Sequence, residues 1–227
     1  MTDKTEKLIN KLNQLEITAE NEDPIRSLIC DLLASDPGEN REDILSVCRK
    51  KLRKLQNEKS RKLKNCLMHQ VDLGALFQNV CIASDALLSS VGKTIDFCCE
   101  TKETDCCPSL IMDAFLNLIS NSAKFSKSDK IYVSLYTKGD GNIITVENEG
   151  SINCADTFRN GGINAAGRVA SLHGGRLFYA SAPSGTKAAI SFPSVRRAYR
   201  KYDVPSFSAF LSDEFSSVQV GLSDVFL

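Results

Sequence analysis

The sequence has no excess of charge of either sign, because 28 Lys and Arg residues balance 28 Asp and Glu residues. A chain without net positive charge does not attract nucleic acid, so we expect no nucleic-acid partner. The sequence also has no run of 18 apolar residues, and its first residues, MTDKTEKLINKL, lack the apolar segment of a signal peptide. We therefore expect a cytoplasmic protein that has no membrane-spanning helix.

Histidine is scarce, since His69 and His173 are the only two in the chain. Chemistry that depends on histidine therefore has only two candidate residues. His173 precedes Gly174 and Gly175 at the predicted end of a helix, where we expect it to cap and to pack. His69 follows a basic predicted helix, at an apparent junction between two domains.

Cysteine, by contrast, is abundant, and the odd count of nine leaves at least one thiol without an intrachain partner. The adjacent pairs Cys98-Cys99 and Cys106-Cys107 lack the C-x-x-C spacing with which two thiolates bind one zinc ion. Neighbouring residues of a strand, as predicted for Cys98 and Cys99, also point to opposite faces. We therefore expect no metal site and mostly buried, reduced thiols.

The first 69 residues predict two long helices joined by a short loop. Apolar residues recur at three- and four-residue spacing in both segments, and Asp36, Pro37 and Glu39 are typical of the start of the second helix. The outer face of the second helix is strongly basic. The two apolar stripes are Leu8, Leu12, Leu15, Ala19, Leu28, Ile29, Leu32 and Leu33, and then Leu45, Cys48, Leu52, Leu55, Leu63 and Cys66.

An antiparallel helical hairpin of this kind has one apolar seam, and two copies of it form a four-helix bundle. The sequence therefore predicts a homodimer through residues 1–69. The alternative to a homodimer is a hairpin that folds back on the rest of its own chain.

Helices and strands alternate in the next part of the chain. We expect a helix capped by Asp72, a strand at TIDFCCET and a helix with Pro108 in its first turn. A hairpin with a GDGN turn, a helix over about residues 163–173, and strands at RLFYAS and KAAISF follow. This order predicts an α+β fold, an α/β sandwich over residues 70–193 with helices on one face of a mostly antiparallel sheet. Residues 194–227 form a C-terminal extension that is basic first and apolar last.

Polar residues form a stripe on the helix predicted at 108–125. Asp113, Asn117 and Asn121 lie four residues apart, with Lys124 close by. Such oxygen ligands can hold hydrated magnesium, and Lys124 can meet a phosphate. Spacing alone favours a simpler interpretation, the solvated polar face of an amphipathic helix. The sequence NGGIN at 160–164 precedes another helix, where backbone N–H groups can approach an anion.

Taken together, residues 71–193 resemble the ATP-binding domain of the histidine-kinase and gyrase-type ATPase superfamily. NLISNSAKFS resembles its N box, and IITVENEG resembles the strand that enters the adenine-binding G1 box. The stretch from NGGIN to AAISFP resembles the G2 box and the strands after it. The resemblance implies a nucleotide site at Asn117, Asn121, Lys124, Asn148, Gly150, Gly162 and Thr186.

The N-terminal hairpin resembles the dimerisation and phosphotransfer domain of histidine kinases, which carries a His-Glu-x-x-x-Pro motif. The stretch TAENEDPIRSL supplies Glu20 and Pro24, but Ala19 stands at the position of the phospho-accepting histidine. The layout also resembles bacterial dimeric histidine phosphotransferases with reduced ATP domains. Because alanine cannot carry a phosphoryl group, we expect no catalytic residue.

The nucleotide site departs from the family pattern in three places. Asn148 replaces the aspartate that reads adenine, and Asn160 replaces the first glycine of the G2 pattern. Only ten residues separate Gly150 from Gly161, where the family has a longer lid, and phosphoryl transfer depends on the positioning that a lid provides. We therefore expect a vestigial site without a cofactor, and the alternative is a site for ATP and magnesium.

These features suggest a non-catalytic, histidine-kinase-like pseudokinase of a two-component phosphorelay. It would bind a response-regulator receiver domain or a histidine kinase. Receiver domains dock low on such hairpins, which indicates Ala19, Glu22, Asp23, Arg26 and Ser27. Two alternatives are an active ATP-binding histidine kinase or phosphotransferase and an anti-sigma-like partner-switching protein, which uses the same ATPase fold.

Overall fold

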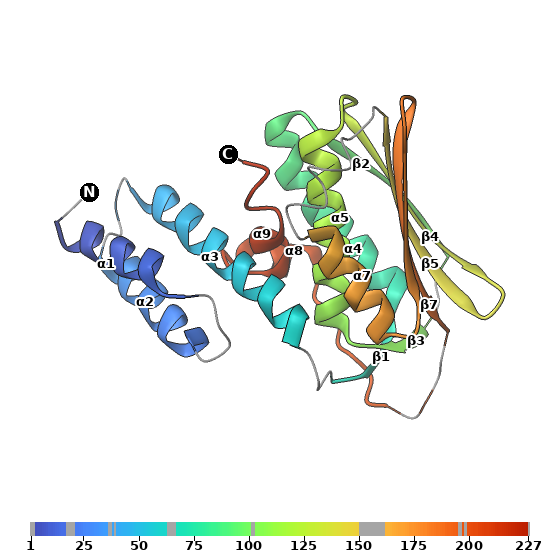
Figure 1. Cartoon of the computed structure of the whole chain (residues 1–227), viewed down its shortest axis with the longest axis horizontal. Helices are drawn as coiled ribbons and strands as arrows, with labels where there is room; N and C mark the ends of the chain where they lie inside the picture. Colours follow the sequence, from blue (N-terminus) through green and yellow to red (C-terminus); the bar gives the residue numbers. More distant parts are fainter. Residues whose placement is uncertain are drawn as a thin grey trace. The chain divides into compact units, whose positions relative to one another are not determined.

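The protein divides into two compact units, Met1–Leu63 and Lys64–Leu227 (Figure 1). The computed structural model describes residues 3–16, 21–35, 38, 40–62, 67–100, 103–149, 162–194, 197 and 199–226. At residues 3, 4, 22 and 59–62 it describes the backbone alone.

The first unit contains three described helices, α1 (Asp3–Gln14), α2 (Glu22–Ser35) and α3 (Arg41–Lys62). The single long helix predicted before residue 36 is therefore wrong, because this segment forms two helices. Pro24 gives the physical reason. Proline has no backbone N–H to donate to the preceding turn, so it is tolerated in the first turn of a helix and not in its interior. A new helix accordingly begins at Glu22.

The predicted apolar stripes form the core of this unit. Helix α1 contacts both α2 and α3, so part of the seam that predicted a homodimer is covered within one chain. The Lys51 ammonium of α3 donates a hydrogen bond of 2.6 Å to the carbonyl of Leu15, directly after α1. Buried members of the stripes are Leu12, Leu28, Ile29, Leu32, Leu45, Cys48, Leu52 and Leu55, whereas Ala19, Leu63 and Cys66 lie outside the described residues.

The second unit contains a five-stranded sheet with the order β2-β4-β5-β7-β6. Its strands are β2 (Thr94–Cys99), β4 (Lys130–Lys138), β5 (Gly141–Glu149), β6 (Arg176–Ala182) and β7 (Gly185–Pro193). All pairs are antiparallel except β2 with β4, which confirms the predicted mostly antiparallel sheet. A separate ladder that the sequence did not predict joins β1 (His69–Asp72) to β3 (Glu103–Cys106).

Helices α4 (Leu73–Leu88), α5 (Pro108–Phe125) and α7 (Gly162–Leu172) cover one face of this sheet (Figure 1). A 3₁₀ turn, η2 (Ser89–Val91), follows α4. Two predicted helix starts are confirmed. The carboxylate of Asp72 accepts a 3.0 Å hydrogen bond from the backbone N–H of Ala75, and Pro108 opens α5. The unit is thus the expected sandwich of helices on a sheet.

The end of the chain belongs to the second unit. Helices α8 (Phe207–Ser212) and α9 (Ser217–Gly221) pack against α4 and α5, on the side of those helices that faces away from the sheet (Figure 1). Val218, Val220 and Leu222 are almost completely buried. The segment that sequence analysis treated as an extension therefore supplies a third layer of this domain.

Leu73–Val91 is the one stretch of the described residues long and apolar enough to cross a membrane by length and composition. This stretch is not an uninterrupted apolar run, because Gln78, Asn79 and Asp85 lie within it. Of this window, 44% is buried inside the protein, where the apolar residues of α4 line the core. Leu73–Val91 is therefore a core helix of the second unit.

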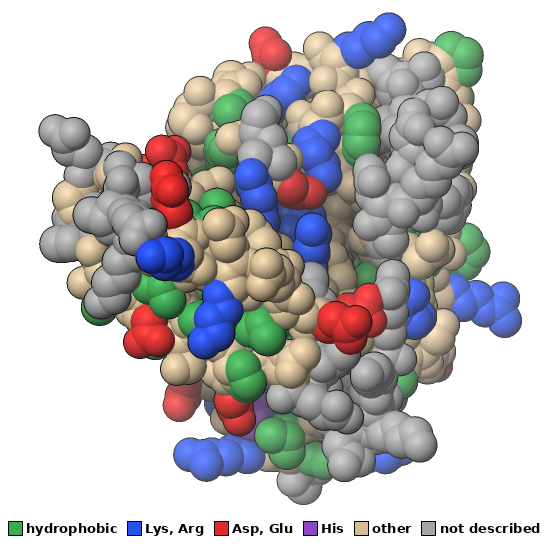
Figure 2. All heavy atoms as spheres, turned by 60° about the vertical axis from the view of Figure 1, so that its left-hand side comes forward, with side chains coloured by type: hydrophobic (Ala, Val, Ile, Leu, Met, Phe, Trp, Pro, Cys, Tyr) green, Lys and Arg blue, Asp and Glu red, His purple; other side chains and the backbone are tan. Residues whose placement is uncertain are grey.

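Charged side chains of both signs are interspersed over the face shown in Figure 2. This distribution agrees with the balanced composition, which predicted no field of one sign.

The His-Gly-Gly turn after α7 gives a first prediction. A Cβ atom at Gly175 would lie 1.6 Å from the backbone oxygen of Ser191, whereas a Cβ at Gly139 would meet no atom within 4 Å. Gly175→Ala should therefore lower the free energy of unfolding by about 3 kcal/mol or more, because strands β6 and β7 must separate. Gly139→Ala, at a residue with a φ of 59°, should cost about 1 kcal/mol of backbone strain. Equal losses of stability in urea denaturation would contradict this account.

Candidate functional site

The two asparagines of the polar stripe on α5 are buried, whereas Asp113 and Lys124 are half-buried. Asn117 and Asn121 are 5% and 7% exposed, so the expectation of a solvated polar face is wrong. Helix α7 packs on α5, and a Cβ atom at Gly162 would lie 3.2 Å from the Oδ1 atom of Asn117. The first turn of α7 therefore lies directly against the first asparagine of the stripe.

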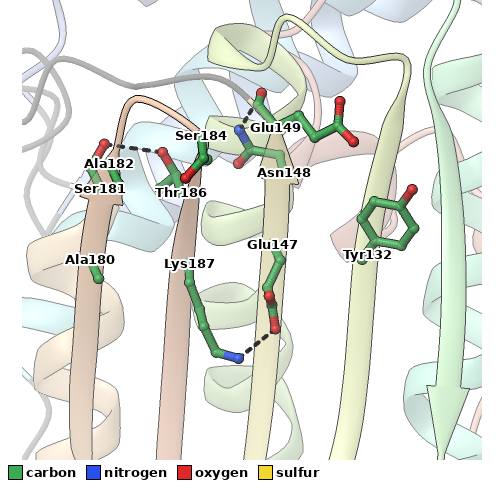
Figure 3. Close-up of a pocket in the computed structure, with 11 residues that line it drawn as sticks. Tyr132, Glu147, Asn148, Glu149, Ala180, Ser181, Ala182, Ser184, Thr186 and Lys187 are labelled. Carbon is green, nitrogen blue, oxygen red and sulfur yellow. Dashed lines mark hydrogen bonds and ion pairs between the residues drawn. The ribbon is translucent and has the colours of Figure 1, made fainter.

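The end of β5 lies beside the start of β7 and contacts the residue that follows α5. Asn148 of β5 is buried and pairs in register with Thr186 of β7. The hydroxyl of Ser126, directly after α5, donates a 3.2 Å hydrogen bond to the backbone oxygen of Glu149. A Cβ atom at Gly185 would lie 2.7 Å from the backbone oxygen of Asn148, so the strands approach closely there. Figure 3 shows the positions of Asn148 and Thr186 on the neighbouring strands.

Two buried amide atoms in this region have no hydrogen-bond partner among the described residues. They are Nδ2 of Asn121, which is a donor, and Oδ1 of Asn148, which is an acceptor. A buried polar atom without a partner costs about 1–3 kcal/mol. A nucleotide offers both acceptors and donors, so it can pair with each of these two atoms. These two asparagines therefore fit the cofactor that the sequence resemblance implied.

Lys124, the cation expected to meet a phosphate, already has a partner in the chain. Its ammonium forms an ion pair with Oδ2 of Asp224, three residues after α9, and the Ser120 hydroxyl donates a 2.9 Å hydrogen bond to Oδ1 of the same carboxylate. The structure thus brings Asn117 close to Gly162 and Asn148 next to Thr186, and it places Lys124 against the C-terminal segment. Gly150 and the expected lid lie outside the described residues.

No protein-family model and no curated protein matches the sequence. Solved structures of histidine kinases match the fold. Full-length ShkA in complex with AMPPNP has a TM-score of 0.60 at 15% identity, over 85% of this chain and 45% of ShkA. The Acinetobacter baumannii histidine kinase AdeS has a TM-score of 0.57 at 14% identity, over 76% of this chain and 94% of that one. The nucleotide-free catalytic domain of histidine kinase ThkA has a TM-score of 0.50 at 17% identity, over 57% of this chain and 99% of that one.

The chain therefore has a histidine-kinase-like ATPase fold. At these identities the likeness establishes the architecture, and the chemistry of the site has to be argued from the residues.

His173 is a structural residue of this fold. Its Nδ1 atom lies 2.8 Å from the carbonyl oxygen of Val169 in α7, and its Nε2 atom accepts a 3.0 Å hydrogen bond from the backbone N–H of Cys107 at the start of α5. This pair of contacts requires the neutral ring with its proton on Nδ1. Burial lowers the pKa of His173, which favours the same form. The predicted capping role is confirmed, and it links α7 to α5.

Most thiols and the other histidine are also held in packed surroundings. Of the seven described cysteines, Cys48, Cys81, Cys106 and Cys107 are buried. Burial raises the pKa of Cys48 to about 12, so this thiol stays protonated at neutral pH. His69 pairs with Cys106 in the β1–β3 ladder, and its ring centroid lies 5.7 Å from that of Tyr202.

The predicted partner-binding residues lie at the start of α2. Asp23, Arg26 and Ser27 are exposed and share one helix face by their spacing. Ala19 lies outside the described residues, and the side chain of Glu22 is not described. The three described residues can therefore take part in one contact surface.

A shallow pocket of the sheet is lined by the predicted residues Asn148 and Thr186, and also by residues that the sequence did not indicate, on the face away from the helices. Figure 3 shows Tyr132, Glu147 and Lys187 projecting from adjacent strands, with a 2.6 Å ion pair between Glu147 and Lys187. The hydrogen bond to Glu147 is the main cause of the raised pKa of Lys187. The strand alternation indicates which residues share this face, but the cross-strand register is needed to bring these three together.

The buried, neutral form of His173 predicts a pH-dependent stability. Because burial lowers its pKa below the ordinary 6.5, the unfolded chain binds more protons than the folded chain as the pH falls. The stabilisation by His173 is therefore complete above pH 6.5 and is lost as the pH falls through the lowered pKa. The free energy of unfolding of wild type relative to His173→Gln, measured in urea, should decrease from about pH 8 to about pH 5. A difference that stays constant or grows on acidification would refute the assignment of the neutral ring.

Proposed function

We propose that this chain is a non-catalytic, histidine-kinase-like protein of a two-component pathway that acts by binding a partner. The observation that carries the proposal is Ala19, which stands where the resembled motif has its phospho-accepting histidine. An alanine side chain has no nucleophile and cannot accept phosphate. The two histidines of the chain lie in the second unit, where backbone groups occupy both ring nitrogens of His173.

The contacts of Lys124 support the same proposal. Phosphoryl transfer requires fixed positive charge at the transferred group, together with bound metal and a positioned acceptor. The negative charge of the Asp224 carboxylate already balances the positive charge of Lys124 in an ion pair. We therefore propose that the nucleotide site is vestigial and that the chain works without ATP or magnesium.

An ATP-using enzyme of the same fold is the second candidate. Nδ2 of Asn121 and Oδ1 of Asn148, which have no partner among the residues that the structure describes, favour it, because a bound nucleotide would satisfy both. The Ser-Ala-Lys sequence after Asn121 also follows the N-box pattern that the sequence resemblance identified. Nucleotide binding by the wild-type protein separates the two candidates.

We propose that the partner is a receiver domain of a response regulator, or a histidine kinase, in the cytoplasm. The contact surface is the face of α2 that carries Asp23, Arg26 and Ser27, which offers an acid, a base and a hydroxyl to solvent. Binding there would act by occupancy, through competition with a genuine kinase for the same partner. We also propose a homodimer through α2 and α3, with α1 as an additional helix of each protomer.

Calorimetry with magnesium-ATP tests the vestigial site. We expect no binding with a dissociation constant below about 100 μM, because the phosphates find no free cation at Lys124. A low-micromolar dissociation constant would favour the enzyme candidate. Titration of an established histidine-kinase ATP-binding domain under the same conditions is the positive control.

A capture experiment tests the contact surface on α2. The wild-type chain should retain a receiver domain, and the double variant Asp23→Ala, Arg26→Ala should weaken its binding by about tenfold or more. The double variant Glu6→Ala, Lys11→Ala removes one exposed acid and one exposed base from α1 and serves as the matched control. Equal weakening by both double variants would remove α2 as the site, and capture of an anti-sigma-type partner would favour the partner-switching alternative.

The same samples report the assembly state. Light scattering should give twice the 24.9 kDa of one chain for the wild type and for both double variants. A mass of one chain would contradict the homodimer and leave the binding surface untouched.

A further inference from the structure

The polar side chains Asn117, Asn121 and Lys124 of α5 follow the pattern of a nucleotide site, yet the C-terminal segment contacts Lys124. We propose that residues 203–226 form an intramolecular competitor, in which the Asp224 carboxylate occupies the position that an anionic phosphate group would take at Lys124. This inference rests on the proposed function, because it gives the physical reason why the site does not bind a nucleotide.

The geometry around Asp224 is that of a bound anion. Ser120 and Lys124 lie one turn apart on α5, so their side chains reach the same point. The hydroxyl of Ser120 donates to one carboxylate oxygen at 2.9 Å, and the ammonium of Lys124 pairs with the other. Hydrogen bonds to a charged group are about twice as strong as those between neutral groups. Both carboxylate oxygens of Asp224 are therefore held by donors of α5.

The segment around Asp224 is fixed by packing, so this contact is not that of a loose tail. A Cβ atom at Gly221 would lie 2.9 Å from two side-chain atoms of Leu116, which shows how closely α9 approaches α5. The hydroxyl of Ser216 donates to the backbone oxygen of Phe210 at 2.6 Å, and Asn79 of α4 donates to that of Pro205 at 2.9 Å. The side chains of Val218, Val220 and Leu222 are buried and also hold this segment in place.

A tethered carboxylate has an advantage over an anion in solution. Its effective concentration at Lys124 is on the order of millimolar or higher, because the packed segment holds it in place. A carboxylate and a phosphate oxygen accept hydrogen bonds from the same kinds of donor. The side chains of Lys124 and Asp224 are 21% and 28% exposed, so rotation of Asp224 alone would open the cation to a solvent anion.

Variants of Asp224 test this competition, with magnesium-ATP and inorganic triphosphate as the probes. Asp224→Asn keeps the shape of the side chain and removes its charge, and Asp224→Ala removes the group. Both should bind the probes at least about tenfold more tightly than wild type, as expected for the loss of one charge-assisted contact. Asp203→Ala removes an exposed charge from the same segment and should leave affinity unchanged. Lys124→Met added to Asp224→Ala should cancel the gain.

The inference is overturned if a folded Asp224 variant binds no better than wild type, or if Asp203→Ala gives the same gain. Circular dichroism and the melting temperature establish that each variant is folded. Should both Asp224 variants unfold, Ser120→Ala removes one of the two contacts and should give a gain of about threefold. No gain in that variant would overturn the inference as well. Tight binding by the wild-type chain is a different outcome, which contradicts the proposed function.

Discussion

Each polar side chain of a buried helix destabilises the fold unless it has a hydrogen-bond partner, and this constraint governs the second domain. Helix α5 is packed on nearly all sides, and Asn117, Ser120 and Asn121 are among its buried residues. A polar group in such surroundings stabilises the fold when it is hydrogen-bonded and destabilises it when it is not. The packing of other elements around α5 therefore depends on hydrogen bonds to its polar side chains as well as on burial of its apolar ones.

Each neighbour of α5 meets this requirement in its own way. Helix α7 brings Gly162 against Asn117, and His173 at its other end accepts the backbone N–H of Cys107. The C-terminal segment supplies the carboxylate that holds Ser120 and Lys124. Within the described part of the chain, Nδ2 of Asn121 and Oδ1 of Asn148 are left without a hydrogen-bond partner. The fold of a nucleotide-binding domain is thus kept, while most of its polar contacts on α5 are made within the chain.

The parts that the sequence predicted are those set by local signals. Asp72 and Pro108 mark helix starts through neighbouring residues alone, and alternation along β4, β5 and β7 identifies the strands. Most of the failures concern long-range contacts. The pairing of Lys124 with Asp224 spans 100 residues, and no local pattern indicates that α7 and α9 bury the stripe of α5. The break at Pro24 was visible in the sequence, but the apolar spacing on both sides outweighed it in the prediction.

A crystal structure determined with magnesium and a non-hydrolysable ATP analogue tests the central claim most directly. If the chain itself occupies the polar groups of α5, the electron density will show Lys124 paired with Asp224 and no ordered triphosphate. A triphosphate and a metal ion held by Asn117 and Asn121, with Lys124 turned away from Asp224, would contradict it.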